Sequence, residues 1–275
     1  MGENRGIPKN IDYESIDYEK PSAARIYDYL LGGYHNFEID RRVAAQLAEI
    51  MPDFPLYVQA NRAFLRRAVR FLANQGIDQF LDFGSGIPTV GNVHEIAQGI
   101  NPSTRVVYVD YDPVAVRHSR TILEDNPNAI AVRADIRKTE VILDHPEVRN
   151  LLDSSKPTAA LLISVLLFIV DNKEAYRLVR VLRDALTPGS YIAISHATAE
   201  GVSPEQAAQG EKLYAASGNP VKLRSHVEIK RFFEGFELVE PGLVLVPLWR
   251  PEGPDELFFD QPELSQNQGG VAYKP

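Results

Sequence analysis

An aspartate and two glycines in the first half of the chain have the spacing of a ligand-binding turn. Asp82 ends a predicted strand in the apolar run QFLDF, and Gly84, Ser85 and Gly86 follow it as a G-x-G turn. Glycines allow a tight turn and let the backbone approach a ligand closely. An acidic side chain beside this turn would repel a phosphate but suits a cationic amino group. The turn therefore predicts a site for an amino-bearing ligand, although Asp82 could instead be a structural cap of its own turn.

Two more aspartates end the next two predicted strands. Asp110 ends RVVYVD, where a carboxylate can accept hydrogen bonds from both hydroxyls of a ribose, and Tyr111 beside it could stack on adenine. Asp135 ends VRAD, where it could accept a hydrogen bond from the adenine amino group while Ile136 offers its backbone N–H to the ring. A site for NAD also uses a carboxylate like Asp110, and Asp135 could merely cap the helix that follows.

The elements that position these residues follow from the pattern after residue 78. Short apolar runs alternate there with helical patterns, which predicts βαβ units and a parallel sheet with helices on both faces. Ligands bind outside the carboxyl ends of such strands, so we expect the three aspartates to meet in one crevice. Ser164, at the end of the fourth strand, could line this crevice or pack in the core. Two late apolar runs, FELVE and LVLVPLW, predict a terminal hairpin.

The segment from Ser22 to Asp40 is the most unusual part of the sequence. Its helical pattern ends at a double glycine, and aromatic and polar residues follow. This arrangement predicts either a packed helix–loop–helix or a lid that closes over the crevice. A lid would bring Tyr29 and Asn36 to the bound molecule. The candidates for substrate contact or a general base are Tyr34, His35 and, after the fifth strand, His196.

Composition excludes several classes of site. The chain has 275 residues, a formal net charge of −8 and no cysteine, so thiolate metal sites and disulfides are excluded and a nucleic-acid partner is disfavoured. No pair of histidines has metal-ligand spacing on one element, so we predict no metal. The polar start of the chain has no signal-peptide pattern, and the longest apolar run, Ala159–Val170, is too short to span a bilayer. We therefore expect a cytoplasmic protein that does not enter a membrane.

The order of these motifs resembles that of class I S-adenosylmethionine-dependent methyltransferases. The stretches ARIYDYLLGGYHNFEIDR and FLDFGSGIPTVGNVHEIAQ are similar, more narrowly, to an actinobacterial S-adenosyl methyltransferase family that was long of unknown function. The resemblance runs from about Ser22 to Pro251. It implies a Rossmann-like α/β fold, with a seven-stranded, mostly parallel sheet whose last strand is antiparallel, helices on both faces and an N-terminal helical extension. It also implies S-adenosylmethionine as the ligand.

This interpretation divides the chain into three parts. Residues 1–76 form an N-terminal arm and a helical lid region, and residues 77–260 form the S-adenosylmethionine-binding core. Residues 261–275, which are rich in Gln, Asn and Gly, are expected to be a flexible tail.

The predicted function is methyl transfer from S-adenosylmethionine to a small-molecule acceptor. One alternative is a non-catalytic regulatory module that binds S-adenosylmethionine. A second is a nicotinamide-dependent dehydrogenase, but the third glycine of the dinucleotide motif is missing where Pro88 and Thr89 stand, and Asp135 is an additional acid.

Overall fold

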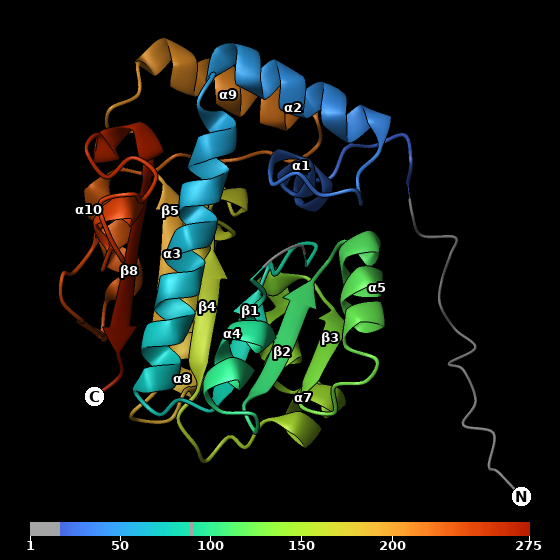
Figure 1. The fold of residues 1–275 in the computed structure, drawn as a ribbon, viewed down its shortest axis with the longest axis vertical. Helices are drawn as coiled ribbons and strands as arrows, with labels where there is room; N and C mark the ends of the chain where they lie inside the picture. Colours follow the sequence, from blue (N-terminus) through green and yellow to red (C-terminus); the bar gives the residue numbers. More distant parts are fainter. Residues whose placement is uncertain (1–16, 89–90) are drawn as a thin grey trace, which may run out of the picture.

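A single twisted sheet forms the centre of the computed structural model, which describes residues 17–88 and 91–275 (Figure 1). The strand order is β3-β2-β1-β4-β5-β8-β6, and a short β7 also pairs with β8. Five parallel strands make up the first part of this order: β1 (Gln79–Phe83), β2 (Arg105–Asp110), β3 (Ala129–Arg133), β4 (Ala159–Ile163) and β5 (Tyr191–Ala197). Strand β8 (Asn267–Tyr273) runs antiparallel to β5 and to the two-residue strands β6 (Glu237–Leu238) and β7 (Val244–Leu245).

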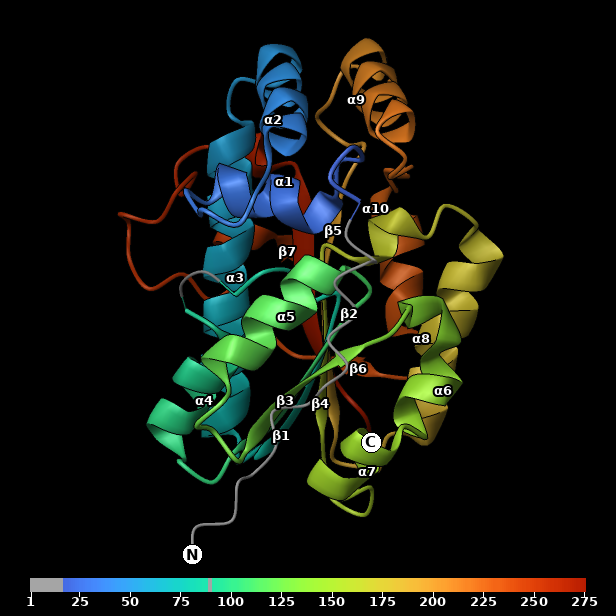
Figure 2. The same cartoon turned by 90° about the vertical axis from the view of Figure 1, so that its right-hand side faces the viewer.

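Helices cover both faces of the sheet, as Figure 2 shows. One face carries α3 (Phe54–Asn74), α4 (Val93–Ile100) and α5 (Pro113–Ile122), and the other carries α6 (Thr139–Leu143), α7 (Pro146–Leu151), α8 (Asn172–Ala185) and α10 (His226–Lys230). Side chains of the central strands alternate between two buried apolar clusters, with Phe80 and Leu161 in one and Leu81 and Leu162 in the other. Burial on both faces explains why these strands are continuous apolar runs. The expected mostly parallel sheet with helices on both faces is confirmed.

Three helices form a cap over the carboxyl ends of the strands. These are α1 (Ala23–Leu30), α2 (Glu38–Ile50) and α9 (Pro204–Ala216), which lie together above the sheet in Figure 1. Their own apolar cluster includes Ile26, Leu47 and Val58, and the partly buried Tyr214 of α9 packs against it. The N-terminal helical extension is therefore confirmed, and a helix from the far end of the sequence completes it.

The end of the chain contradicts the prediction of a flexible tail. Residues 267–273 form the buried strand β8, which pairs with β5 along its whole length. The strand could not be predicted because its sequence is polar and rich in glycine and so lacks an apolar pattern. Its stability comes from backbone hydrogen bonds and close packing instead. A Cβ atom on Gly269 would lie 2.8 Å from Cζ of Phe64, so only glycine fits between this strand and α3.

Two smaller predictions about the elements also differ from the structure. The runs FELVE and LVLVPLW do not pair as a hairpin, because β6 and β7 each pair with β8 instead. The sequence pattern also predicts a helix from Thr89 to Gln98, whereas α4 begins at Val93 in the structure, and Thr89 itself lies outside the described residues. The predicted N-terminal arm falls largely on residues 1–16, which are also outside the described part.

Candidate ligand site at the carboxyl end of the sheet

A cavity of about 370 Å³ lies between the carboxyl ends of the parallel strands and the helical cap. Volumes of this order are typical of small-molecule sites, which span about 300–1,000 Å³. Nine of the predicted ligand residues line it: Asp82, Gly84, Ser85, Gly86, Asp110, Tyr111, Asp135, Ile136 and Ser164. Another hollow, of about 570 Å³, lies between α3 and residues 252–257, but it contains none of these residues. The strand-end cavity is therefore the candidate site.

The G-x-G turn is fixed to the neighbouring strand by three hydrogen bonds, one of which runs from the N–H of Ser85 to the carbonyl of Val109 at 3.2 Å. The N–H of Gly84 donates to the carbonyl of Val109 at 2.8 Å, and the N–H of Gly86 donates to Oδ2 of Asp110 at 2.8 Å. Both glycines have positive φ angles, +67° and +66°. A Cβ atom on Gly84 would lie 2.3 Å from Cγ2 of Val165, whereas one on Gly86 would meet no atom within 4 Å. Gly84 is thus required by packing, and Gly86 leaves open space beside the cavity.

Asp82 is a buried carboxylate that no described residue hydrogen-bonds. It lies in β1, one residue before the strand ends, and only 5% of it is exposed. Burial raises its pKa to about 7, with Arg62 opposing this shift and Asp110 adding to it. Buried charges in proteins are normally paired with an opposite charge. A cation bound in the cavity would therefore stabilise the ionised form of Asp82.

Arg62 was missed by the sequence analysis. It comes from α3, lines the cavity near Asp82, and donates from NH2 to Oδ1 of Asn92 at 3.1 Å. It could not be assigned to the site from local sequence, because only the packing of α3 against the sheet brings it to the strand ends.

Asp110 is held in place by backbone donors on both sides. Its Oδ2 accepts the N–H of Gly86, and its Oδ1 accepts the N–H of Asp112 at 2.9 Å. Burial raises its pKa to about 6, against the lowering effect of these hydrogen bonds. Each oxygen has a further lone pair, so the fixed carboxylate can still accept hydrogen bonds from a ligand.

Asp135 has a partner within the protein. Its Oδ1 accepts the backbone N–H of Arg137 at 3.0 Å, and the guanidinium of the same arginine binds both carboxylate oxygens. Hydrogen bonding to Arg137 holds the pKa of Asp135 below its usual value. The side chain thus caps the short 3-10 helix Ile136–Lys138, which is the alternative that the sequence left open. Tyr111 also has a partner, since its hydroxyl donates to Oδ1 of Asn219 at 3.2 Å.

Most of the predicted lid residues lie away from the cavity. Tyr34 is 92% exposed, and the ring of His35 packs against His118 with a centroid separation of 3.7 Å. The amide of Asn36 donates to Asp28 within the same segment, and Tyr29 is likewise absent from the cavity lining. Helix α1 does cover the cavity, but it does so with three other residues: Ala23, Ala24 and Tyr27.

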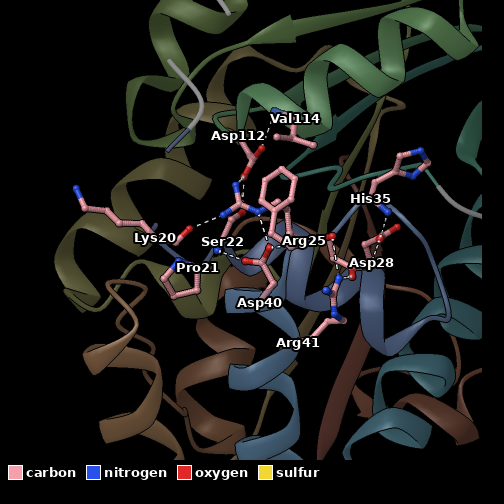
Figure 3. A network of polar contacts seen from close by, with 12 residues as sticks. Lys20, Pro21, Ser22, Arg25, Asp28, His35, Asp40, Arg41, Asp112 and Val114 are labelled. Atoms are coloured by element: carbon pink, nitrogen blue, oxygen red, sulfur yellow. Dashed lines mark hydrogen bonds and ion pairs between the residues drawn. The ribbon is translucent and has the colours of Figure 1, made fainter. Parts of the chain in front are cut away.

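An ion-pair network fixes α1 above the cavity (Figure 3). Nε of Arg25 donates to Oδ2 of Asp40 at 2.8 Å, which ties α1 to α2. NH1 of Arg25 lies 3.6 Å from Oδ2 of Asp112, which caps α5 through the N–H of Val114. The backbone N–H of Ser22 also donates to Asp40. Buried Arg25 therefore joins the cap to the loop that follows β2.

His196 is not the general base that the sequence suggested. It lies inside β5 and is fully buried, because the strand extends to Ala197. NH1 of Arg224 donates to its Nε2 at 2.7 Å, so Nδ1 carries the proton and donates to the carbonyl of Ala197 at 2.8 Å. Burial and Arg224 lower its pKa to about 3. Both ring nitrogens are thus occupied, and the residue is structural.

A search of the described residues for metal-ligand clusters and for membrane-spanning helices found neither. Within residues 17–88 and 91–275, no group of three or more histidine, aspartate or glutamate side chains could hold a metal ion. None of the helices in this described part is long and apolar enough to cross a membrane.

Comparison with known proteins finds relatives that match nearly the whole chain. A sequence model of a family described as S-adenosyl methyltransferase matches residues 9–275. A crystal structure of a DUF574 family protein from Streptomyces avermitilis is 40% identical, with a TM-score of 0.88 over 97% of this chain and 100% of that one. A protein from Thermobifida fusca, described as a presumed methyltransferase, is 41% identical, with a TM-score of 0.87 over 97% and 98% of the two chains. A search of proteins with curated functions finds no match.

Proposed function

The chain belongs to the S-adenosyl methyltransferase family, and we propose that it binds S-adenosylmethionine in the strand-end cavity and transfers the methyl group to a small-molecule acceptor. The observation that carries this proposal is the row of strand-end carboxylates in one cavity, where the buried carboxylate of Asp82 accepts no hydrogen bond from the described residues. A ligand with a cationic amino group would supply that partner.

Asp82 and Arg62 would hold the two charged groups of the methionine part. The amino group carries a positive charge and the carboxylate a negative one, so an adjacent buried acid and base complement both. The raised pKa of Asp82 supports this assignment, because a bound cation would restore the ionised form that burial disfavours. Asp82 would bind the amino group and Arg62 the carboxylate.

Asp110 would bind the ribose, and three neighbours would surround the adenine. The backbone donors that hold Asp110 leave acceptor capacity for two hydroxyls. Tyr111 borders the cavity and would stack on the base, while Ile136 would offer its backbone N–H. Asp135 would make the weaker adenine contact, because Arg137 already shares its carboxylate.

For catalysis, the chain would mainly align the two reactants and exclude water. S-adenosylmethionine, when bound, supplies a methyl group that is already activated on a sulfonium centre. Helices α1 and α9 lie over the cavity and limit the access of solvent to it. The fixed G-x-G turn and the Arg25 network hold the walls in one arrangement, which lowers the entropic cost of alignment.

Two observations favour this proposal over its alternatives. Asp82 beside the turn would repel the pyrophosphate of NAD, which argues against a dehydrogenase. The cavity also continues past Ser164 to residues of α9, such as Tyr214, and this extension beyond the strand-end aspartates is where an acceptor would bind, which a purely regulatory module would not need.

Isothermal titration calorimetry tests the proposal. We expect S-adenosylmethionine and S-adenosylhomocysteine to bind with micromolar dissociation constants, and NAD to give no heat at the same concentration. Tight binding of NAD without heat from either sulfur ligand would refute the proposal.

A further inference from the structure

The cavity has two chemically different halves. The strand order β3-β2-β1-β4-β5 places Asp135, Asp110 and Asp82 in sequence along one half. The other half lies above β4 and β5, where Ser164 and Thr198 follow the strands. Its walls are the first turns of α3, the short 3-10 helix Leu166–Phe168, and α9. If the first half holds the cofactor, the second half is the acceptor chamber.

Aromatic and aliphatic side chains make up the walls of this chamber. Phe54 and Tyr57 of α3 are stacked, with centroids 5.3 Å apart and an interplanar angle of 13°. Phe168 and Tyr214 meet edge to face at 6.2 Å. Apolar residues fill the remaining wall: Met51, Val58, Leu167, Val202, Ala207 and Leu223. Such surfaces favour a flat ring system.

The polar groups of the chamber include three uncharged tyrosine hydroxyls. Burial raises the pKa of the hydroxyls of Tyr27, Tyr57 and Tyr214, so all three remain protonated. Tyr27 donates to the carbonyl of Val58, and Tyr57 interacts with Ser164. Tyr214 has no hydrogen-bond partner among the described residues, so its hydroxyl is available to an acceptor atom on a ligand.

Charged side chains are nearly absent from this half. Among the described lining residues, the only cations are Arg62 and Arg137, and both lie beside the strand-end aspartates. The one acid on the α9 wall is Glu211, whose Oε1 accepts the N–H of Leu223 at 2.9 Å. An anionic acceptor would therefore lose its hydration without gaining a counter-charge, and a cationic one would find only Glu211, whose Oε1 the backbone already occupies, so both kinds of charge are disfavoured.

A glycine in the middle of α9 keeps the chamber open. Gly210 is buried, has an ordinary helical conformation and lines the cavity. A Cβ atom there would meet only Cε of Met51, at 4.0 Å, so space remains beyond it. Glycine inside a helix is less favourable than alanine, because it loses more backbone conformational freedom on folding. A larger residue would thus favour the helix but fill the space.

We propose that this chamber binds a flat, uncharged ring compound that carries a hydroxyl or carbonyl oxygen, with Tyr214 as the donor to that oxygen and Gly210 as the residue that leaves room for the ring. This inference rests on the proposed function, because it assigns the second half of the same cavity. It narrows the acceptor from small molecules in general to uncharged aromatic or polycyclic oxygen compounds.

The test measures the binding of 2-naphthol by fluorescence, with S-adenosylhomocysteine at saturation. Two charged analogues, naphthalene-2-sulfonate and 2-naphthylmethylammonium, serve as comparison probes. The blocking variant is Gly210→Leu. Its matched control is Gly99→Leu, because Gly99 is also a helical glycine with open space around its Cβ position but is exposed on α4.

We expect 2-naphthol to bind the natural protein and Gly99→Leu equally, and Gly210→Leu at least tenfold more weakly. Tyr214→Phe should weaken 2-naphthol severalfold while leaving naphthalene unchanged. The charged analogues should bind at least tenfold more weakly than 2-naphthol. Equal binding by Gly210→Leu, or a charged analogue that binds as well as 2-naphthol, would overturn the inference. Calorimetry with S-adenosylhomocysteine on each variant separates the two proposals, since absence of that binding in the natural protein refutes the cofactor site itself.

Discussion

Replacement of Asp82 by asparagine should stabilise the ligand-free protein while removing its affinity for S-adenosylhomocysteine. The side chain is buried, no described residue hydrogen-bonds its carboxylate, and its pKa is raised from 3.8 to about 7. The unfolded chain ionises this group near its ordinary pKa, so the folded state binds the proton more tightly. Stability from this group is therefore lost as the pH rises towards 7, and the buried charge opposes folding above that pH.

The size of the effect follows from the same pKa. Because a tenfold change in proton affinity is about 1.4 kcal/mol, the ionised carboxylate opposes folding by roughly 4 kcal/mol above pH 7. Asparagine has nearly the same shape but no charge, and its amide must still be hydrated in the cavity. We therefore expect Asp82→Asn to raise the free energy of unfolding by about 2–4 kcal/mol at pH 8. In a chain of this size each kcal/mol raises Tm by about 2–4 °C.

The assay is thermal unfolding between pH 4 and pH 8.5, with and without S-adenosylhomocysteine. The Tm of Asp82→Asn should exceed that of the natural protein at pH 8, and the difference should vanish towards pH 4, where both proteins are uncharged at this position. The ligand should raise the Tm of the natural protein only. The control is Asp144→Asn, because Asp144 is an exposed acid paired with Arg149. A pH-independent difference, or a less stable Asp82→Asn, would show that the desolvated charge is not where the structure puts it.

Four further substitutions test the rest of the site and the packing around it. Asp110→Ala should weaken S-adenosylhomocysteine by about 1.5–3 kcal/mol in calorimetry, because it removes a charged acceptor for two hydroxyls; unchanged affinity would show that Asp110 does not hold the ribose. Gly84→Ala should destabilise the fold through its clash with Val165, whereas Gly86→Ala should keep most of the stability, so equal melting temperatures would contradict the turn geometry. Arg224→Met should lower the free energy of unfolding by about 3–5 kcal/mol in chemical denaturation, because it leaves several buried acceptors without a hydrogen bond; an unchanged free energy of unfolding would contradict this structural role.

The parts of the site that could be predicted are those that local sequence determines. Asp82, Asp110 and Asp135 each follow a short apolar run, and the parallel sheet brings such strand ends to one edge. What their side chains do there could not be predicted in full. Asp135 accepts a hydrogen bond from the backbone N–H of Arg137, two residues later, and so caps the short helix. The sequence was compatible with this cap but did not distinguish it from a contact with adenine.

The missed features depend on contacts between distant segments. Arg62, Tyr57 and Tyr214 reach the cavity because α3 and α9 pack over strands that lie far from them in sequence. Strand β8 was missed because its residues are polar or glycine, and pairing with β5 stabilises them instead of apolar side chains. The prediction for His196 was wrong because β5 extends to Ala197. The residue therefore lies inside the strand and in the core, not after the strand and in the crevice.

A crystal structure with S-adenosylhomocysteine is the most direct test of the central claim. We expect the ribose hydroxyls within hydrogen-bond distance of Asp110, the amino group at Asp82, and the sulfur facing the chamber beneath α9 that Tyr214 and Gly210 line. A ligand bound outside this cavity, or a sulfur that faces a closed wall with no space for an acceptor, would contradict it.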